Sequence, residues 1–99
     1  MVTAMRNAGV PSDISDAAGT FCCNHLMYGV LHHIAQHELD IRAGWIHLPT
    51  LPEVAALERN LGVPSMSLAT ATSGVHAGIA AIGKHPRDSN DVVTSRLQI

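Results

Sequence analysis

Apolar residues recur at helical spacing in the first half of the chain. From Cys23 to Ile34 they fall every third or fourth residue, which is the pattern of one face of an amphipathic helix. Thr20 comes just before this pattern, where a hydroxyl can cap the unpaired amides of a first turn, and Gly19 permits a tight entry. We therefore predict a helix from about residue 21 to residue 38, with Cys23 in its first turn.

A second apolar run, at residues 41–48, has the length and composition of a buried strand. Gly44 lies within it and Pro49 ends it. His47 then stands at the carboxyl end of the strand, the edge at which open α/β folds bind their ligands. The amino end of the preceding helix can lie along the same edge, so the pattern predicts that Cys23 and His47 come together.

The rest of the chain alternates short apolar segments with Gly and Pro breaks. We predict, in order, a helix over 1–8 that Gly9 ends, a short strand over 11–16, a short helix over 53–60, and a long helix from 65 or 67 to 83. This last helix is expected to pack through small faces that carry Met66, Ala69, Ala77, Ala80 and Ala81. Residues 87–99 have no clear pattern and are predicted to be a mobile tail of a single domain, 1–99.

Length and charge limit the classes of protein that need consideration. Ninety-nine residues, 46% of them hydrophobic and 14% charged, suit one α/β domain with a modest core. A net charge of −2 argues against nucleic acid or an anionic membrane as an obligatory partner. The sequence has neither an apolar run long enough to cross a bilayer nor a signal peptide pattern. We therefore expect a cytoplasmic protein.

The two cysteines are adjacent, at Cys22 and Cys23, and only one of them suits catalysis. Neighbouring helical side chains point about 100° apart, which makes a disulfide between them implausible and lets only one face His47. In the first turn, the helix dipole favours the thiolate of Cys23, and His47 is its candidate general base. The alternatives are a buried structural thiol and a histidine whose ring is satisfied by backbone. We assign Cys22 to core packing.

The first predicted long helix also carries four histidines, at positions 25, 32, 33 and 37. His33 and His37 are four residues apart and share a face, as metal ligands on a helix do. Zinc would need further ligands at defined spacing, and no such motif is present. A solvated polar face is the preferred interpretation, and we expect no metal and no cofactor.

Three blocks of residues resemble a known family. They are Ala-Gly-Thr-Phe at 18–21 with Cys-Asn-His-Leu-Met-Tyr at 23–28, Gly-Trp-Ile-His-Leu-Pro at 44–49 with Leu-Pro-Glu at 51–53, and Pro-Ser-Met-Ser-Leu at 64–68. In this order and spacing they resemble the signature of the pyroglutamyl peptidase I (pyrrolidone-carboxylate peptidase) family. The resemblance extends from Met1 to about Ile82, and the cysteine and histidine blocks together make it specific.

The resemblance implies a cysteine-type omega-peptidase that removes N-terminal pyroglutamate from small peptides with a Cys-His-Glu triad. Cys23 and His47 match its nucleophile and base, and Phe21 matches an aromatic residue of the pyroglutamate pocket. The implied fold is a three-layer α/β/α sandwich of the phosphorylase/hydrolase-like type. The resemblance also implies a homo-oligomer.

The acid of the triad does not carry over, because in the family it lies in an upstream half that this sequence lacks. The chain is therefore expected to be the C-terminal part of the domain, truncated at the N-terminus. Asp16, Asp40 and Glu53 are other acids that could orient His47, and we rank them behind the family's acid. The competing hypotheses are a catalytically inactive remnant or interaction module that needs the missing half, and, third, a histidine-rich metal binder.

Overall fold

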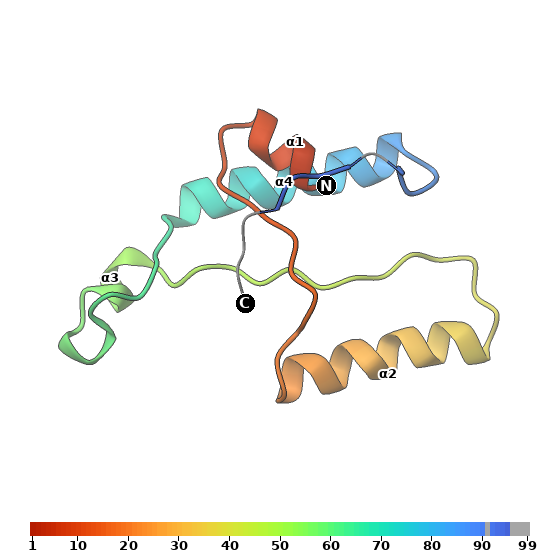
Figure 1. Cartoon of the computed structure of the whole chain (residues 1–99), viewed down its shortest axis with the longest axis horizontal. Helices are drawn as coiled ribbons and strands as arrows, with labels where there is room; N and C mark the ends of the chain where they lie inside the picture. The colour runs from red at the N-terminus through yellow and green to blue at the C-terminus, as the bar shows by residue number, and fades with distance from the viewer. Residues whose placement is uncertain (91, 96–99) are drawn as a thin grey trace. The chain divides into compact units, whose positions relative to one another are not determined.

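The computed structural model describes residues 1–90 and 92–95, which fall into two compact units (Figure 1). One unit combines residues 1–14 with the described residues from 48 onward and contains α1, α3, the 3₁₀ helix η1 and α4. The other unit is Ser15–His47 and contains α2.

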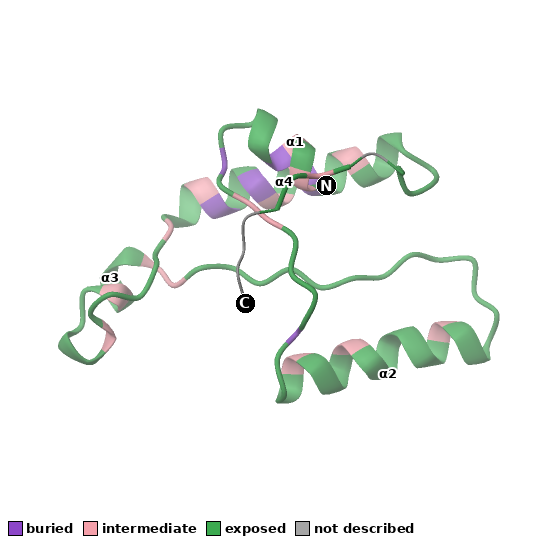
Figure 2. Cartoon of the chain, viewed as in Figure 1, coloured by how far each residue is buried: buried purple, intermediate pink, exposed green. Residues whose placement is uncertain are grey.

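The first unit is built on the packing of α1 (Val2–Asn7) against α4 (Leu68–Lys84). Its most buried apolar side chains include Met5, 8% exposed, and Val10, 6% exposed (Figure 2). A Cβ on Gly74 would lie 2.8 Å from Val10 Cγ1, and one on Gly78 would lie 2.6 Å from Met5 Cε. Val10, just after α1, can therefore approach α4 this closely only because residue 74 is glycine, and Gly78 leaves room for the end of the Met5 side chain from α1.

α4 has the predicted small-residue face, but the residues that form it differ from those predicted. The buried residues of α4 are Ala71, Gly74 and Gly78, at helical spacing of three and four. Among the predicted residues, Ala69 and Ala80 are exposed instead. The pattern showed several small-residue stripes on this helix, and only the docking of α1 selects one of them.

We expect Gly74→Ala to destabilise the chain, although alanine is the better helix former by about 1 kcal/mol. The new methyl group would overlap the β-branched Val10, and overpacking of this kind costs about 1–3 kcal/mol. Gly83→Ala is the matched control on the same helix, because nothing lies within 4 Å of its added Cβ. Urea denaturation of both variants measures the difference, and a Gly74→Ala as stable as Gly83→Ala would contradict the close contact.

Local signals place the helix ends of this unit well. Gly9 has φ +78° after α1, as predicted for the residue that ends it. Ser67 is the N-cap of α4, and its Oγ accepts a hydrogen bond from the Thr70 amide at 3.2 Å. The helix predicted over 53–60 forms as two short pieces, α3 (Pro52–Ala55) and η1 (Glu58–Asn60).

In the second unit, α2 (Cys22–Gln36) confirms the predicted helix with ends shifted by one or two residues. The predicted Thr20 cap is wrong, because the N-cap is Phe21 and no side chain caps this end. Gly19, at φ +82°, supplies the predicted tight entry. At the other end, the amides of Glu38 and Leu39 donate to Ala35 and Ile34, at 3.3 and 3.0 Å. This is the Schellman arrangement, with Glu38 at φ +49° where glycine is usual.

Both predicted strands are wrong for the described residues. Residues 11–16 and 41–48 contain no strand, and the described pairing is one isolated parallel bridge between Thr50 and Ser65. A strand exists only with a hydrogen-bonded neighbour, and 41–48 has none here. Its apolar side chains are accordingly open to solvent, with Trp45 37% and Leu48 58% exposed.

The guanidinium of Arg6 makes three polar contacts that join α1 to two segments of the first unit, residues 12–13 and residue 94. Its Nε donates to the Ser12 carbonyl at 3.0 Å, and its Nη1 donates to the Thr94 carbonyl at 2.8 Å. Its Nη2 pairs with Asp13 Oδ1 at 3.2 Å. The predicted mobile tail, 87–99, lies partly outside the described residues, since 91 and 96–99 are not among them. Its described part contains no helix or strand, and Thr94 within it accepts the hydrogen bond from Arg6.

Candidate functional site

Cys23 lies in the first turn of α2, as predicted. It is the second residue of the helix and is half-buried, whereas Cys22, the first residue, is exposed. Both are free thiols. Because no side chain caps this end of α2, the first backbone amides of the turn remain available to a ligand. Cys23 therefore stands beside several unused donors at the positive end of a helix.

His47 is the last residue of the same unit and is exposed. Its ring meets the edge of the Trp45 ring, with centroids 6.3 Å apart and planes at 65°. In an extended backbone, residues two apart project to the same side, which accounts for this contact. No role for Trp45 was predicted, although its spacing of two from His47 is a signal for this contact.

The structure places Cys23 and His47 in one unit but does not join them by a hydrogen bond among the described residues. Asp16 and Asp40, the candidate acids of this unit, are exposed and neither pairs with His47. No acid of the unit thus orients the imidazole. The third candidate acid, Glu53, is the second residue of α3 in the other unit.

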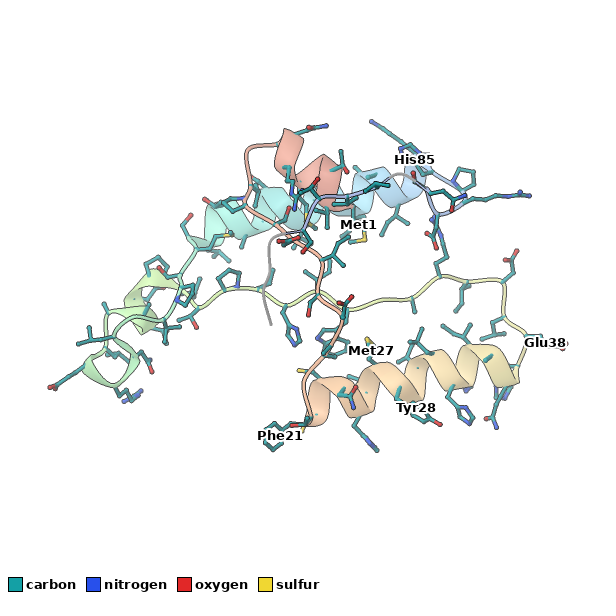
Figure 3. The ribbon with its side chains drawn as sticks, in the orientation of Figure 1. Met1, Phe21, Met27, Tyr28, Glu38 and His85 are labelled. Atoms are coloured by element: carbon teal, nitrogen blue, oxygen red, sulfur yellow. The ribbon has the colours of Figure 1, made fainter. Side chains whose placement is uncertain are left out.

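Phe21 stands at the amino end of α2 with its ring turned away from the helix and 84% exposed (Figure 3). Its carbonyl accepts the first bond of the helix, from the His25 amide at 3.1 Å. An aromatic side chain this exposed contributes little to the packing of its own unit. It is available as a wall for a ligand held at the amino end of α2.

His33, in the last turn of α2, and His37, its C-cap residue, bring their rings side by side as predicted, and both are exposed. The described residues contain no group of three or more His, Cys, Asp or Glu side chains placed to hold a metal. Within the part of the chain that the structure describes, no helix meets the length and hydropathy needed to cross a membrane.

A thiol in the first turn of a helix and a histidine are the residue types that cysteine-dependent hydrolases use as nucleophile and base. The family comparison makes this specific. Residues 1–85 match the family model described as pyroglutamyl peptidase, and the chain belongs to this family. The resemblance seen in the sequence is therefore confirmed.

The mycobacterial relatives match the chain over its full length. It is 69% identical over all 99 residues to a pyrrolidone-carboxylate peptidase of Mycobacterium marinum, and 68% identical to that of Mycobacterium tuberculosis. Over 88 residues it is 48% identical to pyrrolidone-carboxylate peptidase 2 of Photorhabdus laumondii. No solved structure gave a significant match.

The chain spans 45% of the length of the mycobacterial relatives and 39% of the Photorhabdus protein. The pyroglutamyl peptidase family is an α/β family, so the predicted class holds for the family. The described residues of this chain are helical or irregular.

Proposed function

We propose that this chain carries the nucleophile and base of a cysteine-type omega-peptidase that removes N-terminal pyroglutamate from peptides. The observation that carries the proposal is the match of residues 1–85 to the pyroglutamyl peptidase family. Mycobacterial relatives named pyrrolidone-carboxylate peptidase, 68–69% identical over the whole chain, support it. Cys23 is the proposed nucleophile, His47 the base, and Phe21 a wall of the pyroglutamate pocket.

In the proposed reaction, His47 takes the proton of the Cys23 thiol, and the thiolate attacks the pyroglutamyl carbonyl. The C–N bond then breaks as the imidazolium protonates the leaving amine, which leaves a thioester on Cys23. Water attacks the thioester and releases pyroglutamate. These steps need no metal or cofactor.

The uncapped amino end of α2 supports this chemistry. The tetrahedral intermediate places negative charge on the former carbonyl oxygen, and preorganised backbone amides stabilise such a charge. The amides of the first turn have no side-chain cap to displace. We assign the oxyanion site to this turn, next to Cys23.

The proposed active fold is an α/β/α sandwich in which residues 41–48 form a strand. Their apolar composition, with Gly44 inside and Pro49 at the end, supports this, because strands of parallel sheets are buried on both faces. A strand there would carry His47 at its carboxyl end. The neighbouring strands and the triad acid are proposed to come from the part of the relatives' length that this chain does not span. A homo-oligomer remains part of this proposal.

A second candidate function is a non-catalytic remnant or interaction module. Two observations favour it: α2 has no buried residue, and the exposed run at 41–48 has no strand neighbour. Both surfaces suit docking of another polypeptide. Covalent labelling of the cysteines separates the two candidates.

We expect iodoacetamide at limiting concentration and neutral pH to label Cys23 faster than Cys22, although Cys22 is the more exposed. The reason is that only the thiolate reacts, and His47 is proposed to deprotonate Cys23 alone. Mass spectrometry of the digested adduct measures both rates. In His47→Ala, labelling of Cys23 should slow while that of Cys22 is unchanged. Faster labelling of Cys22 in the parent chain would contradict the assignment.

A further inference from the structure

Two histidine rings are in close contact at the carboxyl end of α2, one from His33 in its last turn and one from His37, its C-cap residue. The centroids of His33 and His37 are 4.1 Å apart and the ring planes are tilted by 35°. Neighbouring turns of a helix bring side chains four residues apart onto one face, so both rings are presented from the same side of α2. Both residues are exposed, and a solute can reach them without any change in packing.

A hydrogen bond to the backbone sets the tautomer of one ring. Nδ1 of His37 lies 2.9 Å from the His33 carbonyl oxygen, and because an oxygen of this kind only accepts, Nδ1 carries the proton and donates. The lone pair of neutral His37 is therefore on Nε2, which points away from this bond. In a metal-ligating histidine, the ring nitrogen that does not bind the metal usually donates its N–H to a carboxylate, a backbone carbonyl or water. The His33 ring makes no hydrogen bond among the described residues, so its nitrogens are available too.

The surrounding charge favours a cation at this turn. The 15 residues of α2 include no Lys or Arg, and the helix carboxyl end carries the negative end of the dipole. Glu38 and Asp40 follow directly, and Figure 3 places Glu38 at this end of α2. Nothing on the helix opposes a divalent ion there.

From this geometry we infer that His33 and His37 form a two-imidazole site for a late first-row divalent cation such as Ni²⁺, Cu²⁺ or Zn²⁺. Imidazole nitrogen is a preferred ligand for these ions and a poor one for Mg²⁺ or Ca²⁺. Water fills the remaining coordination positions, since no third protein ligand is placed there among the described residues. The site is separate from Cys23, which lies at the opposite end of the same helix.

The test is calorimetric titration of the whole chain with Ni²⁺ in a Cys22→Ser/Cys23→Ser background, so that thiols do not compete for the ion. We expect His33→Ala and His37→Ala each to weaken Ni²⁺ binding at least about tenfold, because each removes half of a chelate. His32→Ala is the matched control. Its ring stacks on Tyr28 instead, with centroids 5.6 Å apart, and its loss should leave the affinity unchanged.

A second measurement identifies the coordinating nitrogen. On addition of Zn²⁺ to chain labelled with ¹⁵N histidine, the Nε2 resonance of His37 should move to the position of a metal-bound nitrogen, while Nδ1 keeps its proton. Three results would overturn the inference: no Ni²⁺ binding by the parent at millimolar concentration, equal losses in His32→Ala and His37→Ala, or an unchanged His37 Nε2 resonance.

Discussion

Replacing Cys23 with serine is expected to abolish hydrolysis of a pyroglutamyl substrate, and replacing His47 with alanine should do the same. With the same base, a serine hydroxyl is a far weaker nucleophile than a cysteine thiolate. Without the imidazole, nothing accepts the proton of the Cys23 thiol or donates a proton to the leaving amine. Because residues that act as a unit are not additive, the double variant should be no worse than either single one. Release of a fluorogenic amine from a pyroglutamyl conjugate measures all three.

Chelation supplies the control for this experiment. EDTA should leave turnover unchanged, since the proposed mechanism uses no metal, even though it would strip a cation from His33 and His37. Cys22→Ser should retain activity, because Cys22 lies at the same helix end but only Cys23 is proposed to be the nucleophile. Activity that disappears with EDTA and returns with Zn²⁺ would replace the thiol mechanism with a metal-dependent one.

The second large effect concerns the part of the relatives' length that this chain does not span. We expect the 99-residue chain alone to turn over pyroglutamyl substrate about 10⁴-fold more slowly than the same chain fused to the amino-terminal part of the Mycobacterium marinum relative. Loss of the residue that orients the histidine in a triad costs about this factor. No acid of the unit that contains His47 pairs with it. The pocket would also lack its opposing wall, which impairs substrate positioning.

A fused form in which the triad glutamate of the added part is replaced by glutamine separates these two causes. If the acid matters most, this form should be nearly as slow as the short chain. If the pocket wall matters most, it should recover much of the rate. Equal turnover by the short chain and the unmodified fusion would contradict the prediction, and Asp16 and Asp40 would then be the acids to replace first.

The sequence predicted the helices well because their signals are local. Gly9 ends α1 and Ser67 caps α4 through bonds to residues a few positions away, and such bonds form whatever the rest of the chain does. The same locality placed Cys23 in a first turn. The predicted N-cap, Thr20, was wrong by one residue. The tight entry at Gly19 is followed by a helix whose N-cap is Phe21.

The strands could not be settled in the same way. A strand in a parallel sheet needs a hydrogen-bonded neighbour from elsewhere in the sequence. The apolar run at 41–48 indicates only that this segment is suited to burial, and it does not identify the neighbouring strand. The contact face of α4 was ambiguous for a similar reason, since alanine and glycine stripes both look suitable until Val10 packs on Gly74 and Met5 packs on Gly78. The proposed pairing of Cys23 with His47 also depends on such distant contacts, so the local pattern can suggest these residues but cannot bring them together.

The three bonds of Arg6 have a practical consequence for any fused or rearranged form of the chain. Through the bond from its Nη1 to the Thr94 carbonyl, the first helix and residue 94 lie within the reach of one side chain. Residue 94 can therefore be joined to the start of the first helix by a short flexible linker, and new ends can then be opened in an exposed loop such as that around Gly62. A circular permutant built in this way would keep α1 on α4, and an added segment could then be attached at the new ends.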